Sequence, residues 1–425
     1  MKTVAAVSLG CKVNAYDTDA MLNLFVGEGY TPVDFGGTAD VYLVNTCAVT
    51  NISEQKSRKM LRQAAARNPG AVVIAAGCYA QVDPAGCLNI PGVDIVTGTQ
   101  KKAEVLDAVK RCRKNGLKVN AVSDIIRGGA YEELPAARMS GRTRAYVKIQ
   151  EGCENNCSYC IVPYARGDVK SRKPDDIYAE ALRFARDGFK EIVITGTEIA
   201  SYGTDLTYAD LMDVVRLIHR IDGMERIRFS SAPPHIVTDT FIDTVAALPK
   251  ICRHFHISLQ SGSDAVLADM NRRYTADIYK NAVTRIKNAF PDVGITTDVI
   301  VGFPGETDAD FEKTYELCEE IGFSKIHVFP YSPKKGTPAA VYANQTDGGT
   351  KKCRAERLTA LSDALRRTFN RRFIGRSMPV LFEKAERRGR YEGYTDNYIR
   401  ITAPSDHDLV NTIKIITVGP DNLLY

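Results

Sequence analysis

The sequence predicts an α/β protein made of three successive parts, and two patterns carry that prediction. Short runs of Val, Ile and Ala alternate with longer amphipathic stretches from Lys2 to about Val122, and again from Ala145 onward, as is typical of parallel sheets with crossover helices. From Met378 to Tyr425 short apolar runs instead alternate with turn residues, without a helical period. We therefore expect a parallel βα domain, a parallel barrel and a small antiparallel β-barrel.

The first domain is expected to span residues 1–122. Its strands are predicted at the short apolar runs Val4–Ser8, Val41–Asn45 and Val72–Ala76, each of which is followed by a longer amphipathic segment. The polar stretch from Ser123 to Arg144 contains Gly128-Gly129 and is predicted to be a linker.

The second domain, residues 139–372, holds six predicted strands. Helical segments such as Ile177–Asp187 and Ala209–Ile221 separate them, so six βα units predict a partial or complete parallel barrel. A basic helix, roughly Lys351 to Phe373, ends this domain. The six strands are Ala145–Gln150, Glu191–Thr195, Arg226–Ser231, His254–Gln260, Ile295–Val301 and Lys325–Pro330.

The third domain, residues 375–425, is predicted to be the small antiparallel β-barrel. Its expected strands are Val380–Glu383, Tyr398–Thr402 and Thr412–Val418.

Composition and cysteine usage indicate a cytoplasmic protein without a membrane partner. The chain has 425 residues, 44% hydrophobic and 25% charged, and no run approaches the roughly 20 apolar residues of a membrane span. Met1-Lys2 leads directly into the first strand without a signal-peptide pattern. Eleven cysteines in such a chain favour thiolate chemistry, such as metal binding, over a disulfide framework.

The net charge of +5 is unevenly distributed. Between Lys351 and Arg400 there are fourteen Lys or Arg residues against six Asp or Glu residues. Such a basic segment on a near-neutral body indicates either a nucleic-acid footprint or an ordinary solvated face.

Cys153, Cys157 and Cys160 follow a predicted strand with the spacing C-x3-C-x2-C. Thiolates so spaced on one loop can each bind a different iron of a cube-shaped [4Fe–4S] cluster, and three ligands leave the fourth iron open. A structural zinc site would need a fourth ligand, and this loop contains none. With Tyr159 before the last cysteine, the motif resembles that of the radical S-adenosylmethionine (SAM) superfamily. This resemblance implies that the open iron chelates SAM and that reductive cleavage yields a 5′-deoxyadenosyl radical.

Several predicted strand ends resemble the SAM-contacting segments of that superfamily. Thr195-Gly-Thr-Glu198 stands in place of the methionine-binding motif, and Leu259-Gln-Ser-Gly262 stands where the ribose is contacted. Thr297–Glu306 resembles the motif beside the adenine. The resemblance implies SAM contacts from Tyr159, Glu198 and Gln260. Arg272 is a candidate carboxylate partner or a surface arginine.

Three further cysteines each follow a predicted strand of the first domain, at Cys11, Cys47 and Cys78. Because the carboxyl ends of parallel strands meet at one edge of a sheet, these residues can converge despite their separation in sequence. The alternative is three buried cysteines that pack as small hydrophobic groups. The other five, Cys87, Cys112, Cys252, Cys318 and Cys353, lack this phasing and are interpreted as structural.

Two three-cysteine sites, a radical-SAM core and a basic β-rich tail together resemble the methylthiotransferase family. The resemblance implies a second [4Fe–4S] cluster on Cys11, Cys47 and Cys78, and a C-terminal RNA-binding TRAM domain that Gly393–Tyr398 resembles closely. The segments Leu9–Asp17, Asn45–Asn51, Arg144–Cys153, Tyr164–Gly167 and His327–Ser332 look like the branch that acts on N6-threonylcarbamoyladenosine. Ser230–His235 departs from the Glu-Pro segment common in that branch, which affects the expected contacts of the third barrel strand.

This resemblance implies that a methylthio group is inserted at C2 of N6-threonylcarbamoyladenosine at tRNA position 37. The C2–H bond is strong and non-acidic, so the chemistry falls to the clusters and the radical, and no side chain is predicted as an acid, base or nucleophile. Implied partners are the tRNA anticodon stem-loop and an electron donor such as flavodoxin or ferredoxin, and we expect a monomer.

Lys384, Arg387, Arg388 and Arg390 are predicted to contact RNA phosphates. Tyr394 and Tyr398 would stack on bases or pack within the barrel. Two other functions remain open. One is a sister methylthiotransferase acting on N6-isopentenyladenosine or on a ribosomal-protein aspartate; the other is a non-catalytic iron–sulphur RNA-binding or redox-sensing protein.

Overall fold

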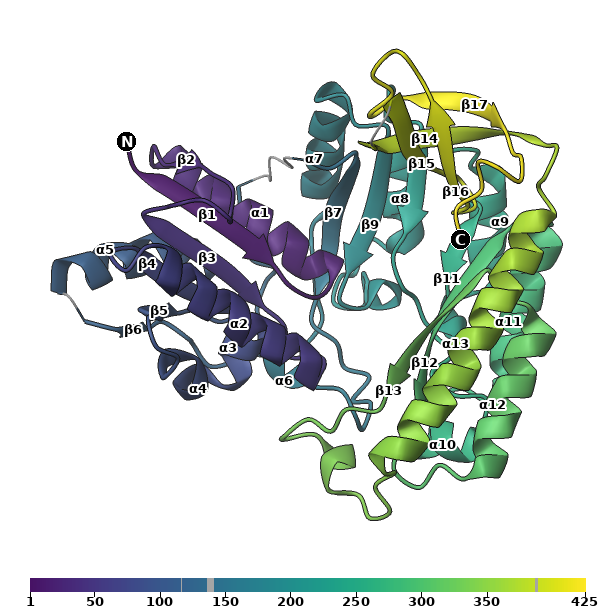
Figure 1. Cartoon of the computed structure of the whole chain (residues 1–425), viewed down its shortest axis with the longest axis horizontal. Helices are drawn as coiled ribbons and strands as arrows, with labels where there is room; N and C mark the ends of the chain where they lie inside the picture. The colour runs from purple at the N-terminus through teal and green to yellow at the C-terminus, as the bar shows by residue number, and fades with distance from the viewer. Residues whose placement is uncertain (116, 136–140, 387–388) are drawn as a thin grey trace. The chain divides into compact units, whose positions relative to one another are not determined.

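The chain folds into two compact units. The computed structural model describes residues 1–115, 117–135, 141–386 and 389–425, and Figure 1 shows the order of the elements along the chain. The first unit contains Met1–Ser140, Lys148–Arg172 and Ser332–Ala340. The second contains Gly141–Val147, Lys173–Tyr331 and Val341–Tyr425. The boundaries of the three domains expected from the sequence stay a prediction.

The first unit is built on a six-stranded parallel sheet with the order β2-β1-β3-β4-β5-β6. The three predicted strands are confirmed as β1 (Thr3–Ser8), β3 (Val41–Thr46) and β4 (Val72–Gly77). The other strands are too short to show an apolar pattern and were not predicted: β2 (Thr31–Pro32), β5 (Ile95–Val96) and β6 (Val119–Asn120).

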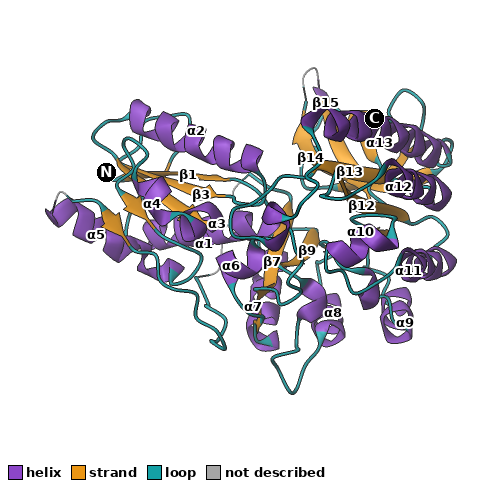
Figure 2. Cartoon of the chain, turned by 90° about the horizontal axis from the view of Figure 1, so that it is seen from below, coloured by secondary structure: helices purple, strands orange, loops and turns teal. Residues whose placement is uncertain are grey.

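Helices cover both faces of this sheet (Figure 2). On one face, α1 (Lys12–Gly27) and α5 (Val105–Asn115) pack on β1, β3 and β4 through buried residues that include Phe25 and Val109. On the other face lie α2 (Asn51–Arg67), α3 (Cys78–Val82) and α4 (Pro84–Leu88), with Leu61 and Ile90 buried among them. The sheet is therefore buried on both sides, as is usual for a parallel sheet.

Two later segments belong to this unit. Ile161 and Ala165, at the start of and within α6 (Val162–Arg166), pack into the same apolar cluster as α2 to α4. The segment Ser332–Ala340 is held by a buried Lys334, whose Nζ lies 2.6 Å from Glu54 Oε1. The backbone N–H of Ala339 donates to the carbonyl of Ser158, 2.8 Å away.

The barrel strands follow one another in chain order, and the six that the sequence predicts are confirmed. They are β7 (Arg144–Glu151), β9 (Glu191–Gly196), β10 (Arg226–Phe229), β11 (His254–His256), β12 (Gly294–Val301) and β13 (Lys325–Pro330). They form two sheets, β10-β9-β7-β8 and β11-β12-β13, in which β8 (Lys170–Ser171) is antiparallel to β7. Single parallel bridges, Ile227 to Ile251 and Ala232 to Ile257, join β10 to the segments around β11.

Strand β11 is shorter than predicted because the chain becomes irregular after His256. Gln260 has a left-handed backbone with φ of 67°, and it pairs with Val299 only as an isolated bridge. The helices of the second unit are α7 (Pro174–Arg186), α8 (Leu211–His219), α9 (Asp239–Ala247), α10 (Asp264–Asp269), α11 (Ala276–Ala289), α12 (Asp308–Ile321) and α13 (Gly348–Arg371). Within the described ranges, no helix is long and apolar enough to cross a membrane.

The tail forms a curled four-stranded antiparallel sheet, which confirms the predicted β-rich C-terminus. Its order is β16-β15-β14-β17, with β14 (Ser377–Ala385), β15 (Arg390–Thr395), β16 (Arg400–Pro404) and β17 (Ile413–Thr417). β15 was not predicted as a strand. Leu423 pairs with Ile401, and Phe373 from the end of the α13 segment packs into the core of the sheet. Arg226 of β10 donates to the carbonyls of Tyr394 and Pro379, so the tail is tied to the barrel within one unit.

Candidate functional site

Three loops at the carboxyl edge of the first sheet carry Cys11, Cys47 and Cys78. Cys11 is the N-cap of α1, Cys47 follows β3 directly, and Cys78 is the first residue of α3. Cys11 is exposed, whereas Cys47 and Cys78 are buried. Burial raises the pKa of Cys47 and of Cys78, and the nearby Cys11 adds to the rise at both. The structure therefore brings the three cysteines together.

Asn14 of α1 ties these loops to one another. Its Nδ2 donates to the carbonyls of Leu9 and Thr46, at 2.8 and 2.9 Å, just before Cys11 and Cys47. Its Oδ1 lies 3.9 Å from the Sγ of Cys78. One buried amide thus contacts all three loops, which fixes their spacing.

Burial determines the protonation state of Cys47 and Cys78 in the absence of a metal ion. Removal from water raises the pKa of Cys78 to about 11, although the nearby Arg166 guanidinium opposes the rise. Burial likewise raises the pKa of Cys47. At neutral pH these groups are thiols unless a metal ion displaces their protons, and a cluster of soft thiolate donors suits iron or iron–sulphur ligation.

The backbone leaves room beside these sulphurs only because residue 10 is glycine. Gly10 has φ of 95°, and a Cβ placed there would lie 2.7 Å from the Sγ of Cys47. A side chain at this position would have to displace the thiol. The cradle and the donor set together fit a three-cysteine cluster site.

We therefore expect Gly10→Ala to lower metal occupancy while the protein stays folded. The methyl group displaces Cys47, so iron after anaerobic reconstitution should fall from about eight to about four per chain. The matched control is Gly29→Ala, which has the same kind of backbone, with φ of 82°, but nothing within 4 Å of the new Cβ. Equal iron contents in the two variants would contradict the expectation.

The second triad lies on the loop between β7 and α6. The loop begins at Gly152, where φ is 81° and a Cβ would lie 1.7 Å from the carbonyl oxygen of Asp168. The backbone N–H of Cys153 donates to Gly167, and that of Cys160 donates to Cys157, both at 3.0 Å. Cys157 is buried and the other two are partly exposed, so one side of the loop remains accessible to a ligand.

A buried charge network joins the second loop to the first triad. Arg166 of α6 donates through NH2 to Asn14 Oδ1 at 2.6 Å and through NH1 to Glu151 Oε1 at 2.5 Å. Asp17 of α1 accepts from Arg166 and from Lys148 of β7, at 3.2 and 2.5 Å. The same Asn14 therefore contacts the three cysteine loops and the helix that follows the second triad.

Three cations and three carboxylates meet in this network. Lys102, Lys148 and Arg166 are buried cations, and Asp17 and Glu151 are buried carboxylates. The third carboxylate is the partly exposed Glu132, which lies 2.9 Å from Lys102 Nζ. Burial opposes ionisation of Glu151, but the three cations outweigh it and hold the pKa of Glu151 below its ordinary value. Arg166 also faces Cys78, so its positive charge would complement an anionic thiolate cluster.

The network consists of residues that the sequence analysis missed. Asn14, Asp17 and Arg166 stood inside segments that the branch resemblance had already marked, Leu9–Asp17 and Tyr164–Gly167. Their presence within those segments was the available signal, but only the fold brings the two segments together.

The structure places the predicted SAM contacts at different points of the two units. Tyr159 is a partly buried residue of the second-triad loop in the first unit. Glu198 follows β9 and caps a short turn, accepting from the N–H of Ala200 at 3.2 Å. Arg272 donates to the hydroxyl of Tyr274, which in turn donates to the carbonyl of Leu259, the residue before Gln260. Gln260 and Arg272 thus belong to one hydrogen-bonded segment.

Two of the four predicted RNA contacts, Lys384 and Arg390, lie on described strands of the tail sheet. Lys384 is exposed and pairs with Glu386, and Arg390 is exposed and donates to Thr402. Arg387 and Arg388 lie outside the described residues. Tyr398 stacks on His254 of β11, with ring centroids 4.6 Å apart, and Arg228 lies over its ring, so ordinary packing describes this tyrosine better than base stacking.

Two family models match the chain. The model of the Radical SAM superfamily matches residues 147–318, and the model described as Uncharacterized protein family UPF0004 matches residues 3–98. Among solved structures, the radical S-adenosylmethionine methyltransferase TsrM from Kitasatospora setae has a similar fold. It superposes with a TM-score of 0.60 over 80% of this chain and 74% of that chain, at 15% identity.

Curated relatives match almost the full length. The chain is 42% identical to the threonylcarbamoyladenosine tRNA methylthiotransferase MtaB of Bacillus subtilis (strain 168), over 99% of this chain and 95% of that protein. It is 38% identical to a tRNA-2-methylthio-N(6)-dimethylallyladenosine synthase of Frankia casuarinae, over 91% of this chain and 72% of that protein. The chain therefore belongs to the radical-SAM methylthiotransferase family.

Proposed function

We propose that this protein inserts a methylthio group at C2 of N6-threonylcarbamoyladenosine at tRNA position 37. The observation that carries the proposal is the presence of two three-cysteine sites in one compact unit. A radical generator alone would need only one open site, whereas insertion of sulphur needs a second site to supply it. Full-length similarity to the threonylcarbamoyladenosine branch supports the substrate.

Cys153, Cys157 and Cys160 would hold one [4Fe–4S] cluster, and Cys11, Cys47 and Cys78 would hold the other. A cluster on Cys153, Cys157 and Cys160 would supply the electron that cleaves SAM. A cluster on Cys11, Cys47 and Cys78 would supply the sulphur. The protein's own contribution is to position these cofactors: Asn14 sets the spacing of the first three loops, and Arg166 adds a buried positive charge beside them. SAM contacts are assigned to Tyr159, Glu198, Gln260 and Arg272.

The remaining features of the proposal follow from this activity. The enzyme would work in the cytoplasm as a monomer and take electrons from a donor such as flavodoxin or ferredoxin. We propose a division of labour in which residues 1–122 carry the sulphur-supplying cluster, residues 139–372 form the radical-SAM core and residues 375–425 bind RNA.

Lys384 and Arg390 would bind phosphates of the anticodon stem-loop, together with Arg387 and Arg388. Replacing Lys384 and Arg390 by Ala should weaken binding of any stem-loop sequence and reduce the slope of log K against log salt by roughly one per lost contact. The measurement is a salt titration of stem-loop affinity. The control is Lys313→Ala, an exposed lysine on α12 that also lies near a carboxylate. Unchanged affinity and slope in the double variant would argue against an RNA-binding tail.

The function is tested with the full chain, reconstituted anaerobically with iron and sulphide and supplied with a reductant and SAM. Three anticodon stem-loops differ only at the target base, which is adenosine, N6-isopentenyladenosine or N6-threonylcarbamoyladenosine. Mass spectrometry should find the 2-methylthio product on the last of these. A product only on isopentenyladenosine would assign the chain to the sister branch. Absence of 5′-deoxyadenosine in every reaction would favour the non-catalytic alternative.

A further inference from the structure

Strands β11, β12 and β13 present a polar group on the face opposite their helices. Residues alternate between faces along a strand, and Thr297 faces α11, where its hydroxyl accepts a hydrogen bond from Tyr279. Asp298 therefore faces the other way, on the inner side of the strands. His327 is its register partner on β13, and His256 of β11 is the partner of Thr296, two residues earlier on the same face.

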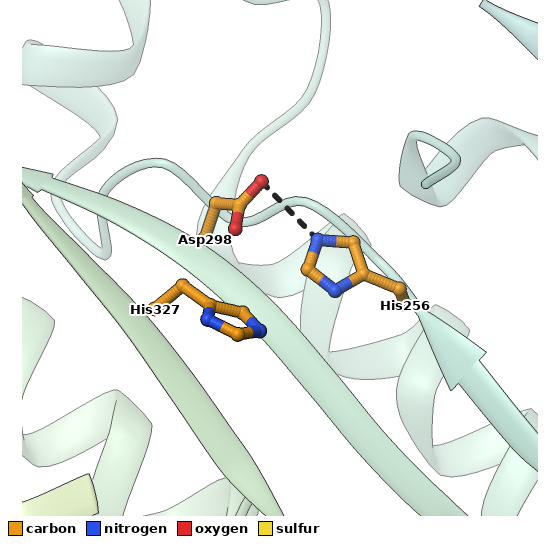
Figure 3. Close-up of side chains that lie close together, drawn as sticks. All are labelled: His256, Asp298 and His327. Carbon is orange, nitrogen blue, oxygen red and sulfur yellow. Dashed lines mark ion pairs between the residues drawn. The ribbon is translucent and has the colours of Figure 1, made fainter. Parts of the chain in front are cut away.

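The three side chains point toward one another (Figure 3). His256 Nε2 lies 3.2 Å from Asp298 Oδ2, and each residue offers a polar atom within 4.8 Å of the others. The imidazole rings of His256 and His327 are 5.7 Å apart. All three residues are partly buried, and 28% of the Asp298 side chain is exposed, so a ligand can reach the group from the inner side.

The orientation of His256 is fixed from behind. Its Nδ1 lies 2.9 Å from the Thr296 hydroxyl, which leaves Nε2 directed at Asp298. That Nε2 is shielded from solvent, and among the described residues it has no partner in hydrogen-bonding geometry. The pair is close but not aligned, and the partly exposed Asp298 carboxylate can still accept a hydrogen bond from a ligand.

We propose that His256, Asp298 and His327 form the binding site for the threonylcarbamoyl substituent of the target adenosine. This inference rests on the proposed function and extends it to the substrate's N6 group. That substituent carries a carboxylate and a hydroxyl on neighbouring carbons, and a urea. The imidazole of His327 donates to the carboxylate, and Asp298 accepts from the hydroxyl or a urea N–H. His256 holds Asp298 from its shielded side.

The same chemistry explains discrimination against an apolar substituent. An isopentenyl group offers no hydrogen-bonding atom, so its entry would desolvate the His327 imidazole and the Asp298 carboxylate without replacing their contacts with water. A site built to hydrogen-bond its substrate rejects analogues that lack the matching groups, because its own polar atoms are then left unpaired.

The test measures equilibrium binding of stem-loops to the full reconstituted chain in the absence of SAM, so that it does not depend on turnover. Two stem-loops carry threonylcarbamoyladenosine with its carboxylate either free or capped as a neutral methyl amide. We expect wild type to bind the capped form roughly 10- to 100-fold more weakly, the factor that a hydrogen bond to a charged group carries. His327→Phe should lose that preference. His407→Phe, the same change in the exposed tail loop, should keep it.

A second variant covers the case in which His327→Phe does not fold. Asp298→Leu keeps the approximate size of the side chain and removes both acceptor oxygens. It should lose the wild-type preference for threonylcarbamoyladenosine over the glycine analogue, which lacks the hydroxyl. The proposal is overturned if both variants retain the wild-type preferences. It is also overturned if the protein binds one divalent ion per chain and Asp298→Leu abolishes that binding, because these side chains would then be metal ligands. The two proposals can fail separately. If wild type shows both binding preferences but forms no methylthio product, the proposed function is refuted and the binding site is still supported.

Discussion

Cys157→Ala is expected to abolish 5′-deoxyadenosine formation, whereas Cys47→Ala is expected to retain it and lose only the methylthio product. Cys157 is the buried member of the loop triad after β7, where the open iron would chelate SAM. Cys47 belongs to the other triad, on the edge of the six-stranded sheet. Removing one ligand from either site should leave the other intact, because the two triads use different loops of the first unit.

The measurements are iron content, 5′-deoxyadenosine and methylthio product for the same protein preparations. Each variant should hold about four irons per chain instead of about eight. Loss of the reductive step should lower 5′-deoxyadenosine by a factor of at least about 10³, to the uncatalysed background. Cys353→Ala, at an exposed cysteine of α13, is the control and should match wild type in all three. If Cys47→Ala also failed to cleave SAM, the two sites would not be separable and the assignment of roles would be wrong.

The strands that carry the cysteines could be predicted from the sequence because each is a short run of mostly apolar residues, and two of them, β3 and β4, are fully buried. β3 and β4 have no exposed residue, so their apolar character is continuous and their ends are sharp. The cysteines stand immediately after those ends, and the convergence of parallel strand ends places them at one edge. Sequence and topology were therefore sufficient to bring Cys11, Cys47 and Cys78 together.

Other features depend on contacts that no local pattern encodes. β5 and β6 contain two residues each and exist because they extend a sheet that is already formed. β15 carries Gly393, whose Cβ position lies 2.3 Å from the carbonyl of Leu381, so close pairing with β14 rather than β-propensity determines it. Within the predicted linker, Leu134 is only 5% exposed, which its polar neighbours did not indicate.

The charge network around Arg166 also depends on contacts between segments that are far apart in the sequence. Its members come from α1, β7 and α6, and Asp17 and Arg166 are 149 residues apart in sequence. In the sequence each is one charged residue among many. Only the fold shows that they are buried together, and burial makes their loss costly because a charge without a partner in the interior is strongly destabilising.

Arg166→Met is accordingly expected to cost about 3–5 kcal/mol of folding free energy. Met is similar in length to Arg but has no guanidinium. The change therefore leaves Asn14 Oδ1, Asp17 Oδ2 and Glu151 Oε1 without the hydrogen bond that Arg166 donates to each. Burial opposes ionisation of Glu151, but Lys102 and Lys148, which this variant keeps, lower its pKa more than Arg166 does. We therefore expect its carboxylate to stay ionised at pH 7, so it cannot relieve the loss by taking up a proton.

The measurement is thermal unfolding of the metal-free protein, where a fall on the order of 10 °C should appear. Arg216→Met is the matched control: Arg216 is 42% exposed and pairs with an exposed Asp213, so its loss should cost no more than about 1 kcal/mol. Arg166→Lys should fall between the two, because an ammonium keeps the charge but cannot reproduce the planar fork that reaches Asn14 and Glu151 together. Equal melting temperatures for Arg166→Met and Arg216→Met would mean that the network does not hold the two cysteine loops together. In that case their spacing would have to come from the apolar core beneath them, where Ile161 and Ala165 pack with Cys78.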